Sequence, residues 1–229
     1  ANAFLVPEAT MAQRISRAKQ TITLGPAAVT DALVTEMGLN PKVIPYVDMP
    51  VQHGSDAVLD RMRRQGSRRQ ILDAVGAWRD AMPGFVWRTS IIVGLPGEGE
   101  REFEDLTGFL EESRPDRLGC FTYSPEEGTS AARMDGQVPE KARRARRKRV
   151  MEGQQARLKT LQEGWVGCRT EALLEQRLPA GIWKARTYHD APEVDGCTYV
   201  EGAGPLAQAG DLLEVRLTGQ SGYDLKASV

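Results

Sequence analysis

Three short segments of the sequence carry side chains that could bind a polar ligand. The first, residues 52–56, places an amide, an imidazole, a hydroxyl and a carboxylate close together, and it includes Gln52, His53 and Ser55. These groups could hydrogen-bond a ribose or the carboxylate of an amino acid. The alternative is that Ser55 or Asp56 only caps the following helix, with His53 an ordinary loop residue.

The second segment, residues 88–98, ends in a glycine-rich turn. Gly94 and Gly97 would let the backbone approach a flat ligand closely. Pro96 would fix the path of the turn between them. An ordinary tight connection between a strand and a helix has a similar composition, so both interpretations stay open for this motif alone.

The third segment, residues 121–128, offers aromatic rings, hydroxyl groups and adjacent carboxylates. Glu126 and Glu127 are neighbours, and adjacent glutamates are more often solvated than catalytic. Tyr123 is therefore the residue of this segment that we expect at a ligand, and the sequence identifies no catalytic acid or base.

Each of these segments should follow a buried strand, because apolar, β-branched runs precede them at residues 43–51, 85–93 and 117–123. Helical spacing predicts helices over residues 27–37, 57–64 and 100–112, and another that starts at Ser67, where Ser67 and Gln70 can form a capping box. Helices that alternate with strands indicate a parallel sheet with right-handed crossovers. In such a sheet the three polar strand ends share one edge.

The rest of the chain changes character twice. Residues 139–164 predict one long helix, and its stretch 141–149 carries seven basic residues and no acidic one. Beyond it, short apolar runs separated by Gly, Pro and Asp predict a small β-barrel or a sandwich. We therefore expect an unassigned segment at 1–26, a partial α/β barrel at 27–138, a linking helix at 139–163 and a β-rich domain at 164–229.

Composition restricts the class of protein further. The 229 residues have a formal net charge of −1, so the chain as a whole is not a polycation. Cys120, Cys168 and Cys197 lack the spacing of metal ligands, and we predict no metal ligand in the chain. There is neither a long apolar run nor a signal-peptide pattern, so a cytoplasmic location without membrane contact is the expectation.

The three segments together resemble the methylthiotransferase branch of the radical-SAM superfamily. Residues 50–56, 88–98 and 118–128 occur in the order and spacing of that branch, and the motif at 92–98 is shared by its tRNA-modifying members. Residues 123–128, 190–196 and 223–225 are similar to the RimO-type members in particular. The resemblance runs from about residue 27 to the C-terminus.

The resemblance implies a partial radical-SAM (TIM-like) barrel followed by a small TRAM barrel. RimO-type enzymes add a methylthio group to the β-carbon of an aspartate in small-subunit ribosomal protein twelve. They use S-adenosylmethionine and two [4Fe–4S] clusters, and a CxxxCxxC loop holds the cluster that cleaves the cofactor. The cofactor supplies the chemistry and the protein supplies binding and orientation.

Matching positions imply which residues border the cofactor. Gln52, His53 and Ser55 would lie at its ribose or methionine part, and residues 92–97 would line its adenine side. The full set implied for cofactor binding is Gln52, His53, Ser55, Arg88, Ile92, Gly94, Pro96, Gly97 and Tyr123.

The sequence also departs from the family. CxxxCxxC does not occur in it, and Gly99 stands where members usually have a residue that can cap a helix. We therefore expect the chain to be inactive alone. The alternatives are a binding module without catalysis, which docks a ribosomal protein or RNA, and a fragment of a tRNA methylthiotransferase.

Charge bears on the expected partner. Residues 164–229 contain six basic and nine acidic residues, a net charge of −3. That disfavours an RNA backbone and favours a basic protein, so we expect ribosomal protein twelve to contact the TRAM-like domain. The basic stretch 141–149 could contact rRNA or could be a solvated face of the linking helix.

Overall fold

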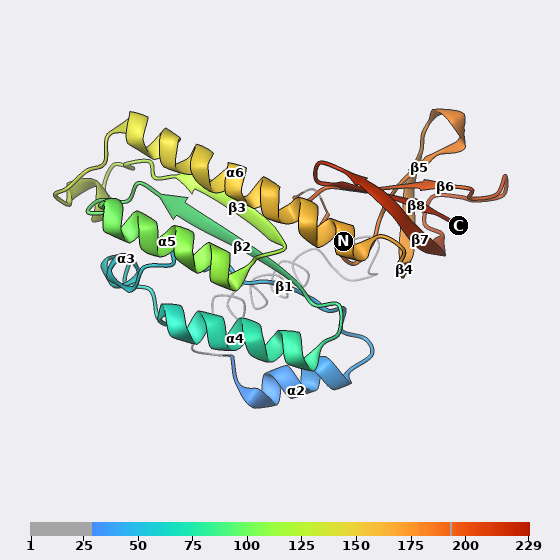
Figure 1. The fold of residues 1–229 in the computed structure, drawn as a ribbon, viewed down its shortest axis with the longest axis horizontal. Coiled ribbons are helices and arrows are strands. Elements are labelled where there is room, and N and C mark those ends of the chain that lie inside the picture. The colour runs from blue at the N-terminus through green and yellow to red at the C-terminus, as the bar shows by residue number, and fades with distance from the viewer. Residues whose placement is uncertain (1–28, 193) are drawn as a thin grey trace, which may run out of the picture.

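A three-stranded parallel sheet forms the centre of the first half of the computed structural model, which describes residues 29–192 and 194–229 (Figure 1). Its strands are β1 (Tyr46–Asp48), β2 (Val86–Val93) and β3 (Arg117–Thr122), in that order across the sheet. Both neighbouring pairs are parallel, as the alternation of helices and strands predicts. The segment 1–26 lies outside the described residues.

Helices cover one face of this sheet. They are α4 (Arg68–Ala81), α5 (Glu100–Ser113) and α6 (Glu140–Trp165), and their apolar sides meet alternate residues of β2 in one core. Along β2, Trp87, Thr89, Ile91 and Val93 are buried, whereas the residues between them are partly exposed. Because side chains alternate along a strand, the residues between them point to the second face, which the described helices do not cover and which we call the open face.

The first strand is much shorter than the predicted 43–51. Pro45 and Pro50 have no backbone N–H and cannot donate to a sheet, so regular pairing is limited to Tyr46–Asp48. Ile44 is 58% exposed, so the apolar run is not covered on both faces as expected. The chain rejoins the sheet at Gln52, which forms an isolated parallel bridge with Ile91.

Two shorter helices lie before and after β1. They are α2 (Asp31–Leu39), capped by the Thr30 hydroxyl, and α3 (Asp56–Arg61). The predicted helix over 57–64 ends early, because Arg63 adopts a left-handed backbone with φ 53°. The predicted capping box is confirmed at the start of α4, where Ser67 and Gln70 bond reciprocally.

The last part of the chain is a closed five-stranded barrel, which decides between the barrel and the sandwich. Its strands follow the order β4-β5-β6-β8-β7 around the barrel. Small and apolar residues such as Ala172, Leu174 and Val200 fill the interior. The strands are β4 (Arg169–Arg177), β5 (Trp183–Arg186), β6 (Thr198–Glu201), β7 (Leu212–Ser221) and β8 (Asp224–Ser228).

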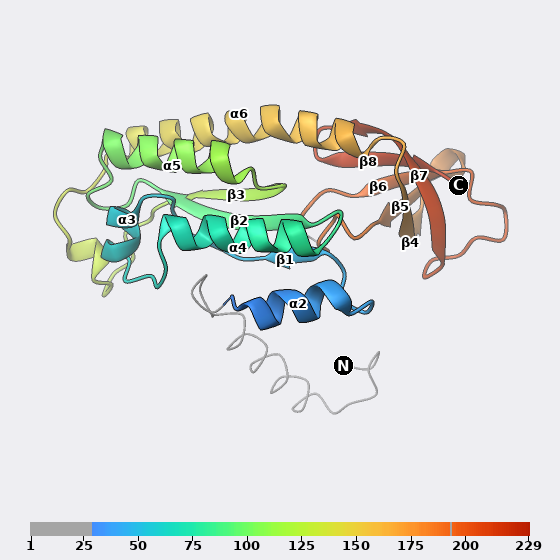
Figure 2. The ribbon, with the colours of Figure 1, turned by 60° about the horizontal axis from the view of Figure 1, so that its bottom comes forward.

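The long helix α6 connects the two parts. Figure 2 shows it running along the sheet and ending at the barrel. Val150 belongs to the core of the sheet, and Trp165 at the other end packs against the core of the barrel. Among the described helices, none has the length and apolar character needed to cross a bilayer.

Candidate functional site

Backbone hydrogen bonds bring the three predicted strand ends to one edge of the sheet. Gln52 donates its N–H to the Ser90 carbonyl at 2.9 Å, and its own carbonyl accepts from Ile92 N–H at 2.8 Å. Tyr123 donates its N–H to the Val93 carbonyl at 2.9 Å, next to Gly94. Gln52, Gly94 and Tyr123 therefore lie side by side at the carboxyl ends of the strands.

Gln52 has an unusual backbone. Its φ is 70°, in the left-handed region that residues other than glycine rarely adopt. Such a conformation costs about 1 kcal/mol or more. It turns the chain from the strand into the segment 53–56 while keeping both backbone hydrogen bonds to β2.

The glycine-rich turn closes around a buried carboxylate. Glu98, which is 2% exposed, accepts the N–H groups of Gly94 at 2.7 Å and Leu95 at 3.3 Å. Its other carboxylate oxygen accepts from Arg146 Nη1 at 2.9 Å, and Arg146 also donates to the Glu98 carbonyl at 2.7 Å. Glu98 thus fixes the turn from inside and ties it to α6.

His53 belongs to the same buried group. Its ring is fully buried, its Nδ1 accepts the N–H of Ser55 at 3.0 Å, and its Nε2 lies 3.4 Å from the Glu98 carboxylate. Ser55 is also buried, and its hydroxyl donates to Asp105 at 3.0 Å. Both side chains face α5 and the glycine-rich turn, so they position the edge instead of lining its surface.

The glycines of the turn make room for arginine side chains. A Cβ on Gly94 would lie 2.0 Å from Cγ of Arg143, and one on Gly97 would lie 1.6 Å from Nη1 of Arg61. Both glycines have positive φ, 78° and 77°. The sequence predicts that a flat ligand would approach the backbone at these glycines. On the side of the turn where a Cβ would project, the side chains of Arg143 and Arg61 occupy that space instead.

The open face of the sheet provides the surface that a ligand could use. Ser90 and Ile92 of β2 are partly exposed on it. Register places Gly119 beside Ser90 and Phe121 beside Ile92, and Phe121 is 58% exposed. This face combines the hydroxyl of Ser90 with the ring of Phe121, and both lie against the space beside Gly119 where a Cβ would project.

Other predicted residues lie apart from this surface. Pro96 is buried and borders a separate cavity of about 210 Å³, together with Val58 and Met134. Arg88 lies toward the opposite end of β2 from Gly94. Its guanidinium is 2.8 Å from Asp48 and 3.4 Å from Asp195, a residue of the loop between β5 and β6.

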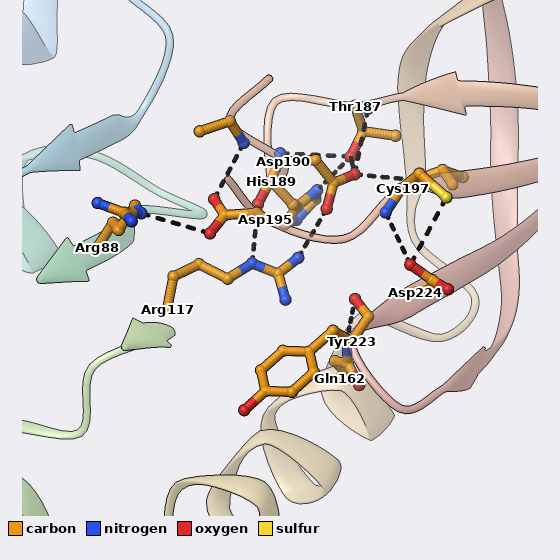
Figure 3. Close-up of polar contacts among 12 residues, drawn as sticks. Arg88, Arg117, Gln162, Thr187, His189, Asp190, Asp195, Cys197, Tyr223 and Asp224 are labelled. Carbon is orange, nitrogen blue, oxygen red and sulfur yellow. Dashed lines mark hydrogen bonds and ion pairs between the residues drawn. The ribbon is translucent and has the colours of Figure 1, made fainter. Parts of the chain in front are cut away.

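That loop fastens the β-barrel to the sheet (Figure 3). Arg117 of β3 donates to Asp190 at 2.7 Å and to the His189 carbonyl at 3.1 Å. The Tyr46 hydroxyl donates to Asp195 at 2.6 Å. These pairs cover the amino-terminal end of the open face, and among the described residues its carboxyl-terminal end is the part left for a ligand.

Burial shifts several pKa values in this contact. It raises the pKa of Asp190, although the nearby Arg117 cation and hydrogen bonds from Thr187 and Thr198 oppose the shift. It lowers the pKa of His189 to about 4, with the Arg117 charge acting in the same direction. Burial and the hydrogen bond to Asp195 raise the pKa of Tyr46.

The important residues that sequence patterns missed are arginines and their partners. Arg143 and Arg146 belong to the basic stretch expected to be solvated or to touch rRNA, yet Arg146 is 7% exposed and Arg143 donates to the Tyr123 carbonyl. Their spacing of three residues puts both on one helix face, which was the available signal. Arg117 and Asp190 are 73 residues apart, and no local pattern connects them.

The described residues do not form a site for an iron–sulfur cluster. In residues 29–192 and 194–229, no three His, Cys, Asp or Glu side chains gather so that they could hold a metal ion. Cys120 is buried in the sheet core, and burial raises the pKa of its thiol to about 12. A thiol in that state is a poor ligand, because metals bind the thiolate.

Comparison with known proteins identifies the family. Residues 10–110 match the radical SAM superfamily and residues 166–229 match the TRAM domain. A protein of Desulfitobacterium hafniense named "Ribosomal protein uS12 methylthiotransferase RimO" is 42% identical over 204 residues, which is 89% of this chain and 46% of that protein. The chain belongs to the RimO-type methylthiotransferases. The expected fold, a partial radical-SAM barrel followed by a TRAM barrel, is confirmed.

A second relative gives the same result. A protein of Anaeromyxobacter sp. (strain Fw109-5) with the same name is 44% identical over 206 residues, which is 89% of this chain and 43% of that protein. The chain thus spans about half the length of the curated relatives it matches. Coproporphyrinogen III oxidase (HemN) of Escherichia coli, a radical SAM enzyme, aligns with a TM-score of 0.49 at 17% identity over 59% of this chain and 31% of its own, a likeness too weak to support an argument.

Proposed function

We propose that this chain takes part in the methylthiolation of ribosomal protein uS12, and that the carboxyl end of its open sheet face holds S-adenosylmethionine. The observation that carries the proposal is the convergence of Gln52, Gly94 and Tyr123 on one edge through backbone bonds to β2. The names of the relatives support the reaction and the substrate. When bound, the cofactor would supply the carbon radical that radical SAM chemistry requires.

The residues at this edge fit a nucleoside with a polar tail. Phe121 offers an exposed ring for stacking an adenine, and Gly119 leaves room for that ring to lie close to the sheet. Ser90 offers a hydroxyl beside it. The Tyr123 hydroxyl is buried and has no hydrogen-bond partner among the described residues, so it is a donor that a ligand could satisfy.

Other predicted residues act indirectly in this proposal. His53 and Ser55 hold the edge in place, and Glu98 holds the turn at Gly94. Arg88 fastens the β-barrel instead of touching the cofactor. The iron–sulfur clusters of the family have no fitting ligand set in the described residues, and we assign them no residue of this chain.

A blocking substitution tests the cofactor site. Ser90→Leu would place a branched side chain on the open face, and Ser221→Leu at the exposed end of β7 is the matched control. We expect saturation-transfer NMR to detect S-adenosylmethionine on the chain and on S221L, and to show a loss of at least tenfold in affinity for S90L. A folded chain that does not bind the cofactor, or an S90L variant that binds it equally well, contradicts the proposal.

Ion pairs with the sheet reduce the negative charge that the barrel could offer to a protein partner. The net charge of −3 in residues 164–229 includes Asp190 and Asp195, which are paired with Arg117 and Arg88 of the sheet. The exposed surface of the β-barrel is therefore less acidic than the sequence indicates. Charge alone gives little support for docking uS12 on the barrel.

An apolar cleft supports a protein partner better. It has a volume of about 580 Å³ and lies between the approach to β1 and the barrel, with Ile44, Tyr46, Leu173 and Leu212 in its lining. Ile44 and Leu212 are 58% and 57% exposed. We propose that uS12 binds here, which is also what a binding module without catalysis would do.

A pull-down assay distinguishes uS12 from tRNA as the partner of the chain. Purified uS12 should bind the chain more tightly than tRNA does, and Leu212→Glu should weaken uS12 binding. Leu206→Glu is the matched control, because Leu206 is 88% exposed and lies outside the cleft. Stronger binding of tRNA than of uS12 would favour a tRNA methylthiotransferase. If the chain binds uS12 but does not bind S-adenosylmethionine, the result would favour the binding module.

A further inference from the structure

A second cavity lies where α6 meets the turn between β7 and β8. Its volume is about 410 Å³, and we call it the α6 groove. One wall consists of α6 residues and the other is the ring of Tyr223. The lining residues are Arg144, Arg147, Lys148, Met151, Glu152, Gln155 and Tyr223.

The cations of the α6 groove are largely free to bind a ligand. Arg144 and Lys148 have side chains 77% and 76% exposed, and in the described part of the chain each pairs with one exposed glutamate one turn away, Glu140 and Glu152. Such exposed pairs contribute little and yield easily to another anion. Arg147 donates from Nε to the Cys120 carbonyl, and its other two nitrogens have no hydrogen-bond partner in residues 29–192 and 194–229.

The aromatic wall is fixed relative to the helix. The Tyr223 carbonyl accepts from Gln162 Nε2 at 3.3 Å, and Gln220 donates to the Lys159 carbonyl at 3.2 Å. Gln162 is fully buried. Figure 3 shows the Tyr223 ring projecting from the turn beside α6, with its hydroxyl directed away from the barrel strands. The α6 groove is therefore formed before any ligand arrives.

We infer that the α6 groove binds single-stranded RNA, with Arg144, Arg147 and Lys148 on the phosphates and Tyr223 stacked on a base. A run of cations beside a fixed aromatic ring is the arrangement that holds a single nucleic-acid strand. Residues 144, 148, 151 and 155 repeat at helical spacing, so they form one stripe along α6. Double-stranded RNA presents no unstacked base to the Tyr223 ring.

The choice of RNA over DNA rests on the proposed function, because a ribosomal substrate is surrounded by RNA. The affinity of the α6 groove for a single-stranded nucleic acid does not depend on the proposed function. The groove also differs from the open face at Ser90 and from the cleft at Leu212. Loss of RNA binding can therefore be separated from loss of cofactor or uS12 binding.

Fluorescence anisotropy tests the inference with the whole chain and a labelled single-stranded RNA of mixed sequence. Arg144→Gln combined with Lys148→Gln should weaken binding and reduce the slope of log K against log salt by about 1.4, since each phosphate contact contributes about 0.7. Tyr223→Leu should weaken binding by about tenfold and leave that slope unchanged, because stacking involves no counterion.

The matched control removes two exposed cations elsewhere, with Arg69→Gln and Lys184→Gln. It should bind RNA as the parent chain does, and circular dichroism should show every variant folded. Absence of RNA binding, equal weakening by the control, or equally tight binding of duplex RNA or polyglutamate would overturn the inference. Tighter binding of single-stranded DNA than of RNA would overturn the choice of RNA, and intact uS12 binding in the same variants would show that the proposed function still stands.

Discussion

Arg117 and Asp190 form a buried ion pair between β3 of the sheet and the loop that follows β5 of the barrel. Their charged atoms are 2.7 Å apart, and each side chain is 1% exposed. A charge buried without its partner is costly, whereas a well-packed apolar pair at the same place can be neutral. This pair therefore makes the orientation of the barrel depend on two residues that no local pattern links.

Asp190→Ala tests that dependence. It leaves the Arg117 cation buried, so we expect a loss of about 3–5 kcal/mol in the free energy of unfolding, measured with urea. The double variant Arg117→Met, Asp190→Leu should lose much less. Glu214→Ala is the control, because it breaks the exposed pair with Arg169 and should cost about 0–1 kcal/mol. A loss in D190A no larger than in E214A would contradict the role of the buried pair.

The sequence predicts best those features of the fold that depend on residues close together in the chain. The capping box at Ser67 and the strand ending at Val93 depend on neighbouring residues and are confirmed. The strand β8 has no continuous apolar run, because its residues 224–228 alternate polar with small or apolar ones. The prolines that shorten β1 were visible, but the apolar run outweighed them in the prediction.

The candidate site was predictable in position and less so in role. Parallel topology brings Gln52 and Tyr123 to one edge, and the segments at strand ends were identified correctly as neighbours. Whether a side chain faces the surface or the core depends on packing between elements. His53 faces inward because Glu98 and α5 lie behind it, and Arg88 faces the β-barrel because Asp195 lies there.

Glu98→Gln tests the turn. It removes the charge that faces Arg146 and His53, so we expect a loss of about 2–4 kcal/mol in unfolding free energy. Cofactor affinity should fall with it, because an amide has one acceptor oxygen and cannot serve both Arg146 and the N–H groups of Gly94 and Leu95. The control is Glu100→Gln, since Glu100 pairs with the same arginine but its side chain is 80% exposed. Equal losses in the two variants would show that burial of Glu98 does not matter.

Gly94→Ala tests the close packing of α6 on the turn. An added Cβ would lie 2.0 Å from Cγ of Arg143. The alanine would also have to adopt the backbone φ of 78° that Gly94 has. Gly128→Ala is the control, because φ there is 83° but no atom of the described residues lies within 4 Å of the added Cβ. The control should cost about 1 kcal/mol from the backbone alone, and Gly94→Ala should cost at least about 1 kcal/mol more. Urea unfolding of the two variants compares them directly, and equal costs would show that Arg143 moves away freely.

His189 should make the contact between sheet and barrel weaken in acid. Its ring packs against those of Trp165 and Tyr188, with centroids 4.4 Å and 3.9 Å away, and burial with the Arg117 charge lowers its pKa to about 4. The unfolded chain therefore takes up a proton near the ordinary value of about 6.5, before the folded chain does. Stability from this group is present above that value and falls as the pH drops toward 4, by at most about 3 kcal/mol.

Asp190 acts in the opposite direction, because its pKa is raised and the folded state accepts a proton first. A difference between variants isolates the histidine. His189→Phe keeps an aromatic ring in the stack and removes the proton, so its unfolding free energy should fall less than that of the parent between about pH 6.5 and about pH 4.5. Parallel pH profiles for the two proteins would show that His189 is not the acid-sensitive group, and a steeper profile for the variant would reverse the assigned sign.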